Sequence, residues 1–330
     1  MAQFRLMPLV LVSAAAHVFL SGSAIAQPPA RDLERLLEEA ITRAAHLSGL
    51  YSEASRELDE PDRGNSLANY GVKEHRCTAL GLLLGWAPAV SALNEIVTDD
   101  GPTADDPVRD ELMSSRAIYL SHFVLNARFT LNQPADERAI SWNLDCVGSF
   151  GIPAAAAVRG PATRAKLRVE GNALIVLGDI EDGFAEEFAR AIAANPKIEV
   201  VAISSGGGGV LEAMRAGQMI RALKLNTELY GNCFSACVFL FMGGVERLVW
   251  RPYPDLGFHQ VSLADDRVSP GDKIYDVIGD YADAMGVNRR FVLAAMFAAK
   301  PEDMFSSDIF ELCDNQVVTF IQGLRAPGQC

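Results

Sequence analysis

The feature that most constrains the fold is the alternation of short apolar runs with helical patterns after residue 165. The apolar runs have the length of strands, and the segments between them carry apolar residues at helical spacing. The clearest expected strands are 173–177, 200–203, 227–230 and 256–258, and the clearest helices are 184–194, 211–223, 272–285 and 288–298. Strands that alternate with helices form parallel sheets covered by helices. The sequence therefore predicts an α/β fold for residues 165–330.

Residues 27–150 carry a different pattern, which predicts a helical N-terminal domain. The first helix is expected around a series of apolar residues spaced by three and four positions: Leu33, Leu36, Leu37, Ala40, Ile41 and Ala44. Further helices are expected at 66–84, 90–97 and 108–126. A stretch rich in alanine, glycine and proline then predicts a linker at 151–164.

The first 26 residues have the composition of a secretory signal peptide. Arg5 provides a positive charge, an apolar run follows at 6–20, and Ala24-Ile25-Ala26 matches a small-residue cleavage pattern. The alternative is an uncleaved membrane anchor, but the run is short for a membrane span and contains Pro8 and His17. We therefore expect that this segment is removed and that the mature protein is secreted or periplasmic.

The six cysteines fit an oxidising compartment, where disulfides persist. The preferred pairs are Cys77–Cys146 and Cys313–Cys330. Cys233 and Cys237 either pair with each other or remain two buried thiols, and the sequence leaves both alternatives open. No group of histidines and cysteines has the spacing of a zinc site, so the sequence predicts neither a metal nor another cofactor.

The formal net charge of -13 bears on the class of partner. A surface that binds nucleic acid needs clustered lysine and arginine to neutralise phosphates. The acidic balance of this chain argues against such a surface, and we expect no nucleic-acid partner.

Three motifs in the α/β half carry residues suited to chemistry. Gly206–Gly209 follows an expected strand, Ser235 lies between an expected strand and a helix, and His259 follows a further strand. Glycine permits close approaches of the backbone, so N–H groups in such a loop can face developing negative charge. A hydroxyl, an imidazole and backbone donors are the groups that acyl transfer requires.

Each motif also has a structural interpretation. The glycine loop lacks the lysine and the spacing of a phosphate-binding loop, which leaves a plain tight turn as its alternative. Ser235 can act as the N-cap of the following helix. His259 can simply bond to the backbone, but it is the only histidine after residue 122. Because histidine exchanges protons near neutral pH, it is the one candidate base in this half of the chain.

The three segments together resemble the Clp-protease/crotonase superfamily over about residues 165–320. The run from Ile203 to Val210 resembles its S-P-G-G loop, with Gly206 in place of the usual proline. Cys233-Phe234-Ser235-Ala236-Cys237 resembles its nucleophile turn, and Gly257-Phe258-His259-Gln260 resembles its histidine segment. The match is closest to secreted bacterial Clp-protease-like proteins. The resemblance implies a ClpP/crotonase-like β/α spiral core, which the helical domain precedes.

The resemblance also implies roles for individual residues. Ser235 is then the nucleophile and His259 the general base. The oxyanion hole consists of the N–H group of Ala236 and that of Gly207 or Gly208.

The third member of a catalytic triad is expected to be an aspartate that orients the histidine. Asp303, in the segment Asp303-Met304-Phe305-Ser306-Ser307, resembles the acidic motif of the superfamily. Asp308 and Asp314 are the alternatives.

These expectations combine into one function. We expect a secreted, ATP-independent serine hydrolase that acts as a peptidase on polypeptide substrates, without a cofactor. The alternatives are a catalytically inactive ClpP-like binding or assembly module, and an esterase that uses the same residues. The resemblance further implies a homo-oligomer, whereas secretion argues against an ATPase partner.

Overall fold

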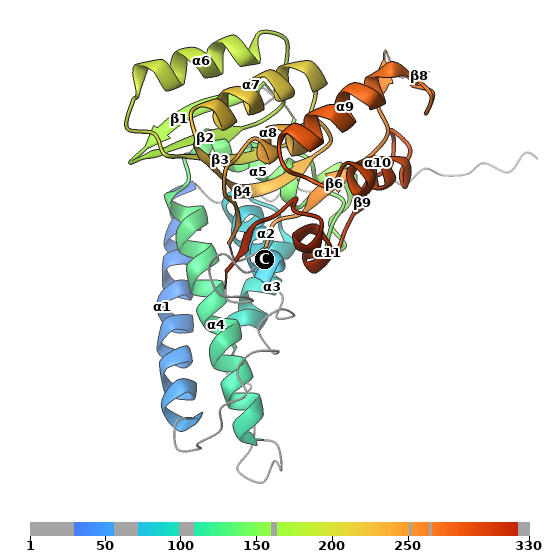
Figure 1. Cartoon of the computed structure of the whole chain (residues 1–330). Helices are drawn as coiled ribbons and strands as arrows, with labels where there is room; N and C mark the ends of the chain where they lie inside the picture. Colours follow the sequence, from blue (N-terminus) through green and yellow to red (C-terminus); the bar gives the residue numbers. More distant parts are fainter. Residues whose placement is uncertain are drawn as a thin grey trace, which may run out of the picture.

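The computed structural model of the protein describes residues 30–55, 72–98, 109–159, 164–250, 253–263 and 266–322. A group of helices forms the first part of the chain, and a sheet with helices on its faces forms the second (Figure 1). This arrangement confirms the predicted α/β class with N-terminal helices. The predicted signal peptide and Cys330 lie outside the described residues.

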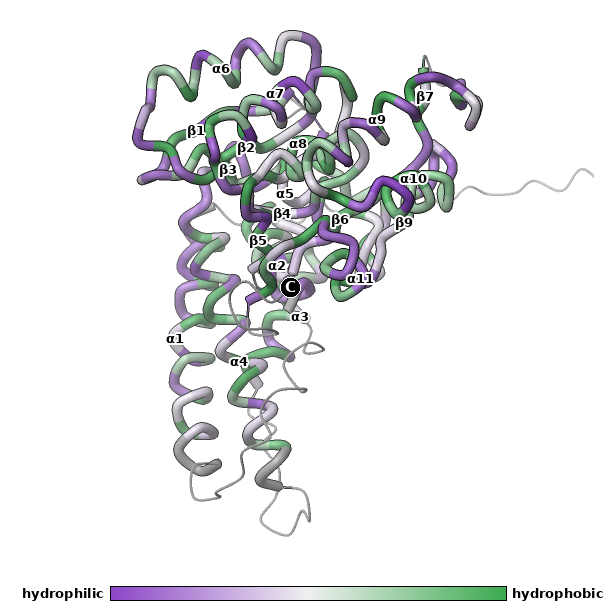
Figure 2. Tube along the Cα trace, in the orientation of Figure 1, coloured by the Kyte–Doolittle hydropathy of each residue, from purple (hydrophilic) through white to green (hydrophobic). Residues whose placement is uncertain are grey.

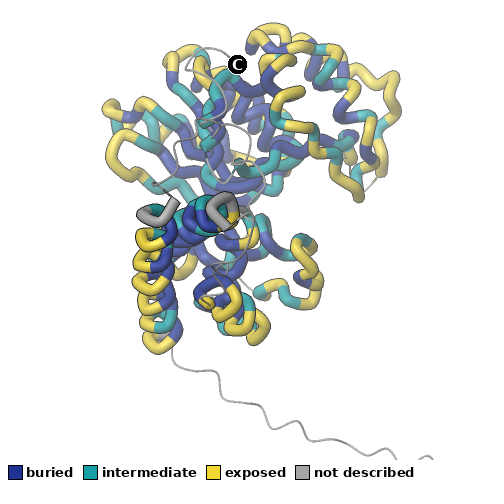
Figure 3. Tube along the Cα trace, turned by 90° about the horizontal axis from the view of Figure 1, so that it is seen from below, coloured by how far each residue is buried: buried dark blue, intermediate teal, exposed yellow. Residues whose placement is uncertain are grey.

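The N-terminal helices pack around an apolar core of their own. They are α1 (Ala30–Ser55), α2 (Val72–Leu83), α3 (Pro88–Val97) and α4 (Arg109–Asn132). The two longest, α1 and α4, lie side by side (Figure 1). The core includes Leu37, Leu93, Leu120 and Phe123, and the exposed residues lie on the outer faces of the helices (Figure 3). Among the described helices, none combines the length and the apolar character needed to cross a bilayer.

His75 on α2 is an ionisable group inside this helical core. Its side chain is 1% exposed, and neither ring nitrogen has a hydrogen-bond partner among the described residues. Its ring lies 4.4 Å from the ring of Tyr119 and 5.7 Å from that of Phe123, centroid to centroid. Burial, together with the nearby His122 and Arg116, lowers the pKa of His75 to about 3. The imidazole is therefore neutral in the folded protein at physiological pH.

We expect the protein to lose stability as the pH falls below about 6.5, where a histidine in the unfolded chain takes up a proton. The folded protein keeps His75 neutral down to about pH 3. The unfolded state therefore binds more protons in this window, and the free energy of unfolding falls with falling pH. From pH 7 to pH 5 this one group costs about 2 kcal/mol.

The variant His75→Phe keeps an aromatic ring against Tyr119 and removes the titrating group. Urea unfolding of both proteins at pH 7 and pH 5 measures the effect. An equal loss of stability in the two proteins would show that His75 does not cause it.

The second part of the chain is built on a mixed sheet. Its strands are β1 (Lys166–Glu170), β2 (Ala173–Leu177), β3 (Val200–Ser205), β4 (Asn226–Phe234), β5 (Arg247–Val249), β6 (Leu256–Phe258), β9 (Phe305–Ser306) and β10 (Phe320–Ile321). The main path runs β1-β2-β3-β4-β5-β10, and β6 pairs with both β4 and β9. The pairs β1–β2 and β6–β9 are antiparallel, and the others are parallel. A separate short hairpin joins β7 (Ser262–Leu263) to β8 (Asp266–Arg267).

Helices cover both faces of this sheet. Successive side chains of a strand point to opposite faces, and in β2 Leu174 and Val176 face one core while Ile175 and Leu177 face another. The first core contains residues of α6 (Phe184–Ala194), α7 (Val210–Ala222), α8 (Cys237–Met242), α9 (Lys273–Ala284), α10 (Arg289–Phe297) and α11 (Ile309–Asp314). The strand β2 and the helix α8 are among the most hydrophobic segments of the trace (Figure 2).

The opposite face of the sheet is covered by α5 (Ala135–Asp145), whose Ile140 packs against Ile175, Leu177 and Ala202. This helix belongs by sequence to the expected domain 27–150, yet it contacts the sheet directly. A short 3-10 helix, η2 (Ala154–Ala156), lies in the segment expected to be a linker. The helical part and the α/β part therefore share a packed interface through α5, and the domain boundaries themselves stay predictions.

Disulfides connect several of these elements. Cys77 and Cys146 form the predicted bond between α2 and the end of α5, with their Cα atoms 5.5 Å apart. Cys233 and Cys237 are bonded to each other, which settles the alternative that the sequence left open. Cys313 is also disulfide-bonded. Its predicted partner, Cys330, lies outside the described residues, so that pairing stays a prediction.

Candidate active site

Ser235 occupies the turn between β4 and α8. Its φ of 57° lies in the left-handed region, which residues with a side chain seldom adopt. The Ser235 N–H donates to the carbonyl of Gly257 at 2.8 Å, and its own carbonyl accepts from Val238 at 3.1 Å. These bonds hold a strained backbone at the end of a strand, a feature that clusters at functional sites. The turn leaves the serine side chain half-buried.

The disulfide Cys233–Cys237 closes around this turn. Cys233 is on β4, Cys237 is the first residue of α8, and both are fully buried. The bond therefore ties the strand to the helix on either side of Ser235. Since α8 is buried along its whole length, the turn is anchored to the core and not to a mobile surface segment.

The glycine loop between β3 and α7 lies directly against the Ser235 turn. A Cβ atom added at Gly207 would lie 2.6 Å from the Cβ of Ser235, and one added at Gly208 would collide with the carbonyl oxygen of Ile180. The φ angles are 106° and 124°. Glycine is required at both positions, because a side chain would clash with neighbouring atoms and strain the backbone.

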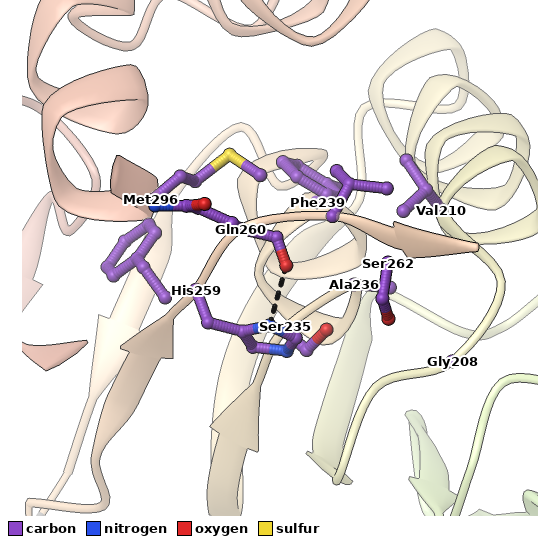
Figure 4. A pocket seen from close by; sticks show the side chains of 11 residues that line it. Gly208, Val210, Ser235, Ala236, Phe239, His259, Gln260, Ser262 and Met296 are labelled. Carbon is purple, nitrogen blue, oxygen red and sulfur yellow. Dashed lines mark hydrogen bonds between the residues drawn. The ribbon is translucent and has the colours of Figure 1, made fainter. Parts of the chain in front are cut away.

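A cavity of about 50 Å³ lies between these segments (Figure 4). Ser235, His259 and Gly208 all line it, together with Ala236. Its remaining walls are mainly apolar: Val210, Phe239, Phe258, Val261 and Met296, with Gln260 and Ser262. Among the residues that line it, His259 is the one ionisable side chain. The structure thus brings the predicted serine, histidine and glycine loop to one cavity.

His259 follows β6, and its ring orientation is set by its neighbour. Nδ1 of His259 lies 2.8 Å from the carbonyl oxygen of Gln260 (Figure 4). A carbonyl oxygen can only accept a hydrogen bond, so Nδ1 carries a proton, and in the neutral form of the ring Nε2 is the nitrogen with the lone pair. Gln260 is held in turn, because its N–H donates to Ala299 at 3.1 Å and its Nε2 donates to Phe297 at 3.3 Å. No sequence pattern indicates that the carbonyl of Gln260 orients the ring of His259, since every residue has a carbonyl.

The hydroxyl of Ser235 and the ring of His259 line the same cavity without a hydrogen bond between them in the described part of the chain. Catalytic hydrogen bonds are often long or poorly aligned before substrate binds. The two side chains thus share a cavity, and no hydrogen bond between them is present in the described structure.

The backbone donors of the site differ in what they already bond. The N–H of Gly207 donates to the hydroxyl of Ser205 at 3.1 Å. The N–H groups of Gly208 and Ala236 have no acceptor among the described residues, and both residues line the cavity. Of the three residues predicted as oxyanion donors, Gly208 and Ala236 are therefore the two whose N–H groups have no partner among the described residues. No sequence pattern indicates that the hydroxyl of Ser205 accepts from the glycine loop.

The three candidate aspartates lie after α10. Asp303 is exposed, and its N–H donates to Lys300 at 3.0 Å. Asp308 caps α11 by accepting from the N–H of Phe310 at 2.8 Å, and Asp314 is the last residue of that helix. No contact at Nδ1 of His259 supports the prediction that Asp303 orients the ring, because the carbonyl of Gln260 occupies that position.

Among the described residues, no group of three or more His, Cys, Asp or Glu side chains could hold a metal ion.

No protein-family model and no curated protein matches the sequence. Among solved structures, ClpP1 from Listeria monocytogenes matches with a TM-score of 0.38 and 18% identity, over 47% of this chain and 95% of its own. A mutant of that ClpP1 has a TM-score of 0.36 and 17% identity over the same shares. A mutant of the 1510-N membrane-bound stomatin-specific protease has a TM-score of 0.34 and 17% identity, over 46% of this chain and 77% of its own.

Proposed function

We propose that this protein is a secreted serine hydrolase that cleaves polypeptides without an ATPase partner. The observation that carries the proposal is that Ser235, His259, Gly208 and Ala236 line one cavity, where the last two have backbone N–H groups without an acceptor among the described residues. The proposed secretion is supported by the signal-like composition of residues 1–26 and by the disulfides, which persist in oxidising compartments. We also propose that the protein forms a homo-oligomer, in which the partners are further copies of this chain.

The proposed reaction follows from the positions of these groups. Nε2 of His259 takes the hydroxyl proton while Oγ of Ser235 bonds to the substrate carbonyl carbon. The carbonyl oxygen becomes negative and accepts from the N–H groups of Gly208 and Ala236. His259 then gives its proton to the leaving amine as the C–N bond breaks. A water molecule then loses a proton to His259 and bonds to the acyl carbon, and His259 returns that proton to Oγ of Ser235 as the ester C–O bond breaks and the acid product leaves.

A fluorophosphonate probe tests this proposal, because it bonds covalently to activated serines. We expect the wild-type protein to be labelled between pH 6 and pH 9 and Ser235→Ala to give no labelling. Ser262→Ala is the matched control, since Ser262 lines the same cavity and should leave labelling intact. Circular dichroism checks that each variant is folded. A folded wild-type protein that is not labelled at any of these pH values would overturn the proposal.

A second function has one observation in its favour. The absence of a hydrogen bond between Ser235 and His259 in the described structure is what a catalytically inactive binding module would show. The same labelling experiment separates the two functions. If labelling occurs, the activities of the protein on p-nitrophenyl acetate and on labelled casein then distinguish an esterase from a peptidase.

A further inference from the structure

The strand that carries the nucleophile turn is irregular just before it reaches Ser235. Along the β3–β4 ladder, β3 advances by two residues, from Ile203 to Ser205, while β4 advances by four, from Leu229 to Cys233. The segment 230–232 therefore forms a bulge. On its other edge, β4 pairs with β5 before the bulge and with β6 after it. A bulge bends its strand and re-aims the residues beyond it, which here include Ser235.

A bulge also removes backbone groups from the ladder, and a buried peptide group without a partner is costly. In this protein the helical part supplies the partners. The N–H of Asn232 donates to Oδ1 of Asp145 at 2.8 Å, and the carbonyl of Tyr230 accepts from Nη1 of Arg76 at 3.1 Å. Gly231 lies so close that an added Cβ would be 2.9 Å from Oδ2 of Asp145. Each residue of the bulge thus contacts α2 or α5.

The two charged residues form one buried unit. Nη1 of Arg76 lies 3.0 Å from Oδ2 of Asp145, and the side chains are only 5% and 8% exposed. The guanidinium also lies over the rings of Phe129 and Tyr230. Burial raises the pKa of the Asp145 carboxyl, and the charge of Arg76 opposes that rise. A buried ion pair seldom adds much stability over apolar residues of similar size. We therefore ask which geometry the Arg76–Asp145 pair fixes, and both residues bond to the bulge of β4.

The contacts continue from the bulge to the turn itself. Oδ1 of Asn232 accepts from the N–H of Asp255 at 2.9 Å, and the carbonyl of Asp255 accepts from the N–H of Cys233 at 2.8 Å. Asp255 is paired in turn with Lys73 of α2 at 2.6 Å. The helical part therefore holds both the bulge and the loop that leads into β6 and His259.

We propose that Arg76 and Asp145 are positioning residues through which the helical part holds the β4 bulge and so aims Ser235 at the cavity. The inference rests on the proposed hydrolase function and deepens it, since it gives the N-terminal helices a role in the reaction. Neither residue touches the cavity that Ser235 and His259 line. Their effect is on where the nucleophile and the Ala236 N–H lie.

The test uses the full chain with the double change Arg76→Met and Asp145→Leu. Replacing both partners avoids leaving a single buried charge, and the adjacent Cys77–Cys146 disulfide keeps α2 and α5 together. The matched control is Arg138→Met with Glu34→Leu, a partly buried ion pair between α5 and α1. The measured quantities are the rate constant of fluorophosphonate labelling at saturating probe and the probe concentration at half saturation.

We expect the labelling rate constant of the double variant to fall by about tenfold to 10²-fold, because small displacements of reacting groups cost this much. The half-saturating probe concentration should stay unchanged, since the cavity walls are intact. The control pair should label at the wild-type rate. The conservative change Arg76→Lys keeps a charged donor and should retain most of the rate. If the double variant does not fold, Arg76→Gln with Asp145→Asn replaces it, since this pair of changes also leaves no single buried charge.

Hydrogen exchange of the segment 234–238 gives a readout that does not depend on hydrolase activity. Faster exchange in the folded double variant, together with slower labelling, supports the positioning role. A folded variant with wild-type exchange and wild-type labelling overturns it. If the wild-type protein is not labelled, the hydrolase proposal fails, and exchange alone decides whether the helical part holds the turn.

Discussion

Replacing His259 with alanine should lower the labelling rate of Ser235 by about 10³-fold or more, whereas Asp303→Asn should change it less than about tenfold. The first expectation follows from the loss of His259, the one ionisable side chain among the described residues that line the cavity. The second follows from the hydrogen bond between Nδ1 of His259 and the carbonyl of Gln260, which already fixes the proton on Nδ1. Loss of an aspartate that orients a catalytic histidine lowers the rate by about 10⁴-fold. The size of the effect of Asp303→Asn therefore distinguishes orientation by Asp303 from orientation by the carbonyl of Gln260.

The measurement is the second-order rate constant for fluorophosphonate labelling of folded protein at pH 7.5. Glu302→Gln is a matched control for Asp303→Asn, because it removes a neighbouring exposed carboxylate. A fall of about 10³-fold or more in Asp303→Asn would restore Asp303 as the third triad member. A His259→Ala protein that labels within about tenfold of the wild type would show that His259 is not the base.

Much of the architecture could be predicted from the sequence because strands and helices leave periodic patterns. The expected strand 173–177 coincides with β2, and the expected helix 184–194 coincides with α6. The glycine loop, Ser235 and His259 come together because they follow β3, β4 and β6, which run parallel and end at the same edge of the sheet. Local patterns located the three motifs, the resemblance implied that they share one site, and the sheet topology explains why they lie together.

The remaining features of the site have no local pattern. Gln260 acts through its backbone carbonyl, which any residue would supply. Arg76 and Asp145 are ordinary charged residues on two helical segments, and only the fold places them on the bulge of β4. The predicted strand 227–230 stopped where this bulge begins, whereas β4 continues to Phe234. Long-range contacts, rather than local preference, hold the last residues of that strand.

Removing the Cys77–Cys146 disulfide should cause the largest loss of stability among these variants. The bond joins residues separated by 69 positions, and chain-entropy arguments assign about 4 kcal/mol to closing a loop of that length. The Cys233–Cys237 bond spans only four positions, for which the same argument gives about 2 kcal/mol. A domain has only about 5–15 kcal/mol of stability in total, so the first change approaches the unfolding threshold.

The two double variants Cys77→Ala with Cys146→Ala and Cys233→Ala with Cys237→Ala form a matched pair, since all four side chains are buried. Urea unfolding at pH 7 should place the first pair about 2 kcal/mol below the second. The labelling rate of Ser235 should show the opposite order, because the short bond encloses the turn that carries Ser235 while the long bond lies outside the cavity. A larger contribution to stability from the Cys233–Cys237 bond would show that chain entropy is not the main source of the stability that these disulfides provide. It would also contradict the expectation that the long bond mainly stabilises the fold and the short bond mainly holds the site.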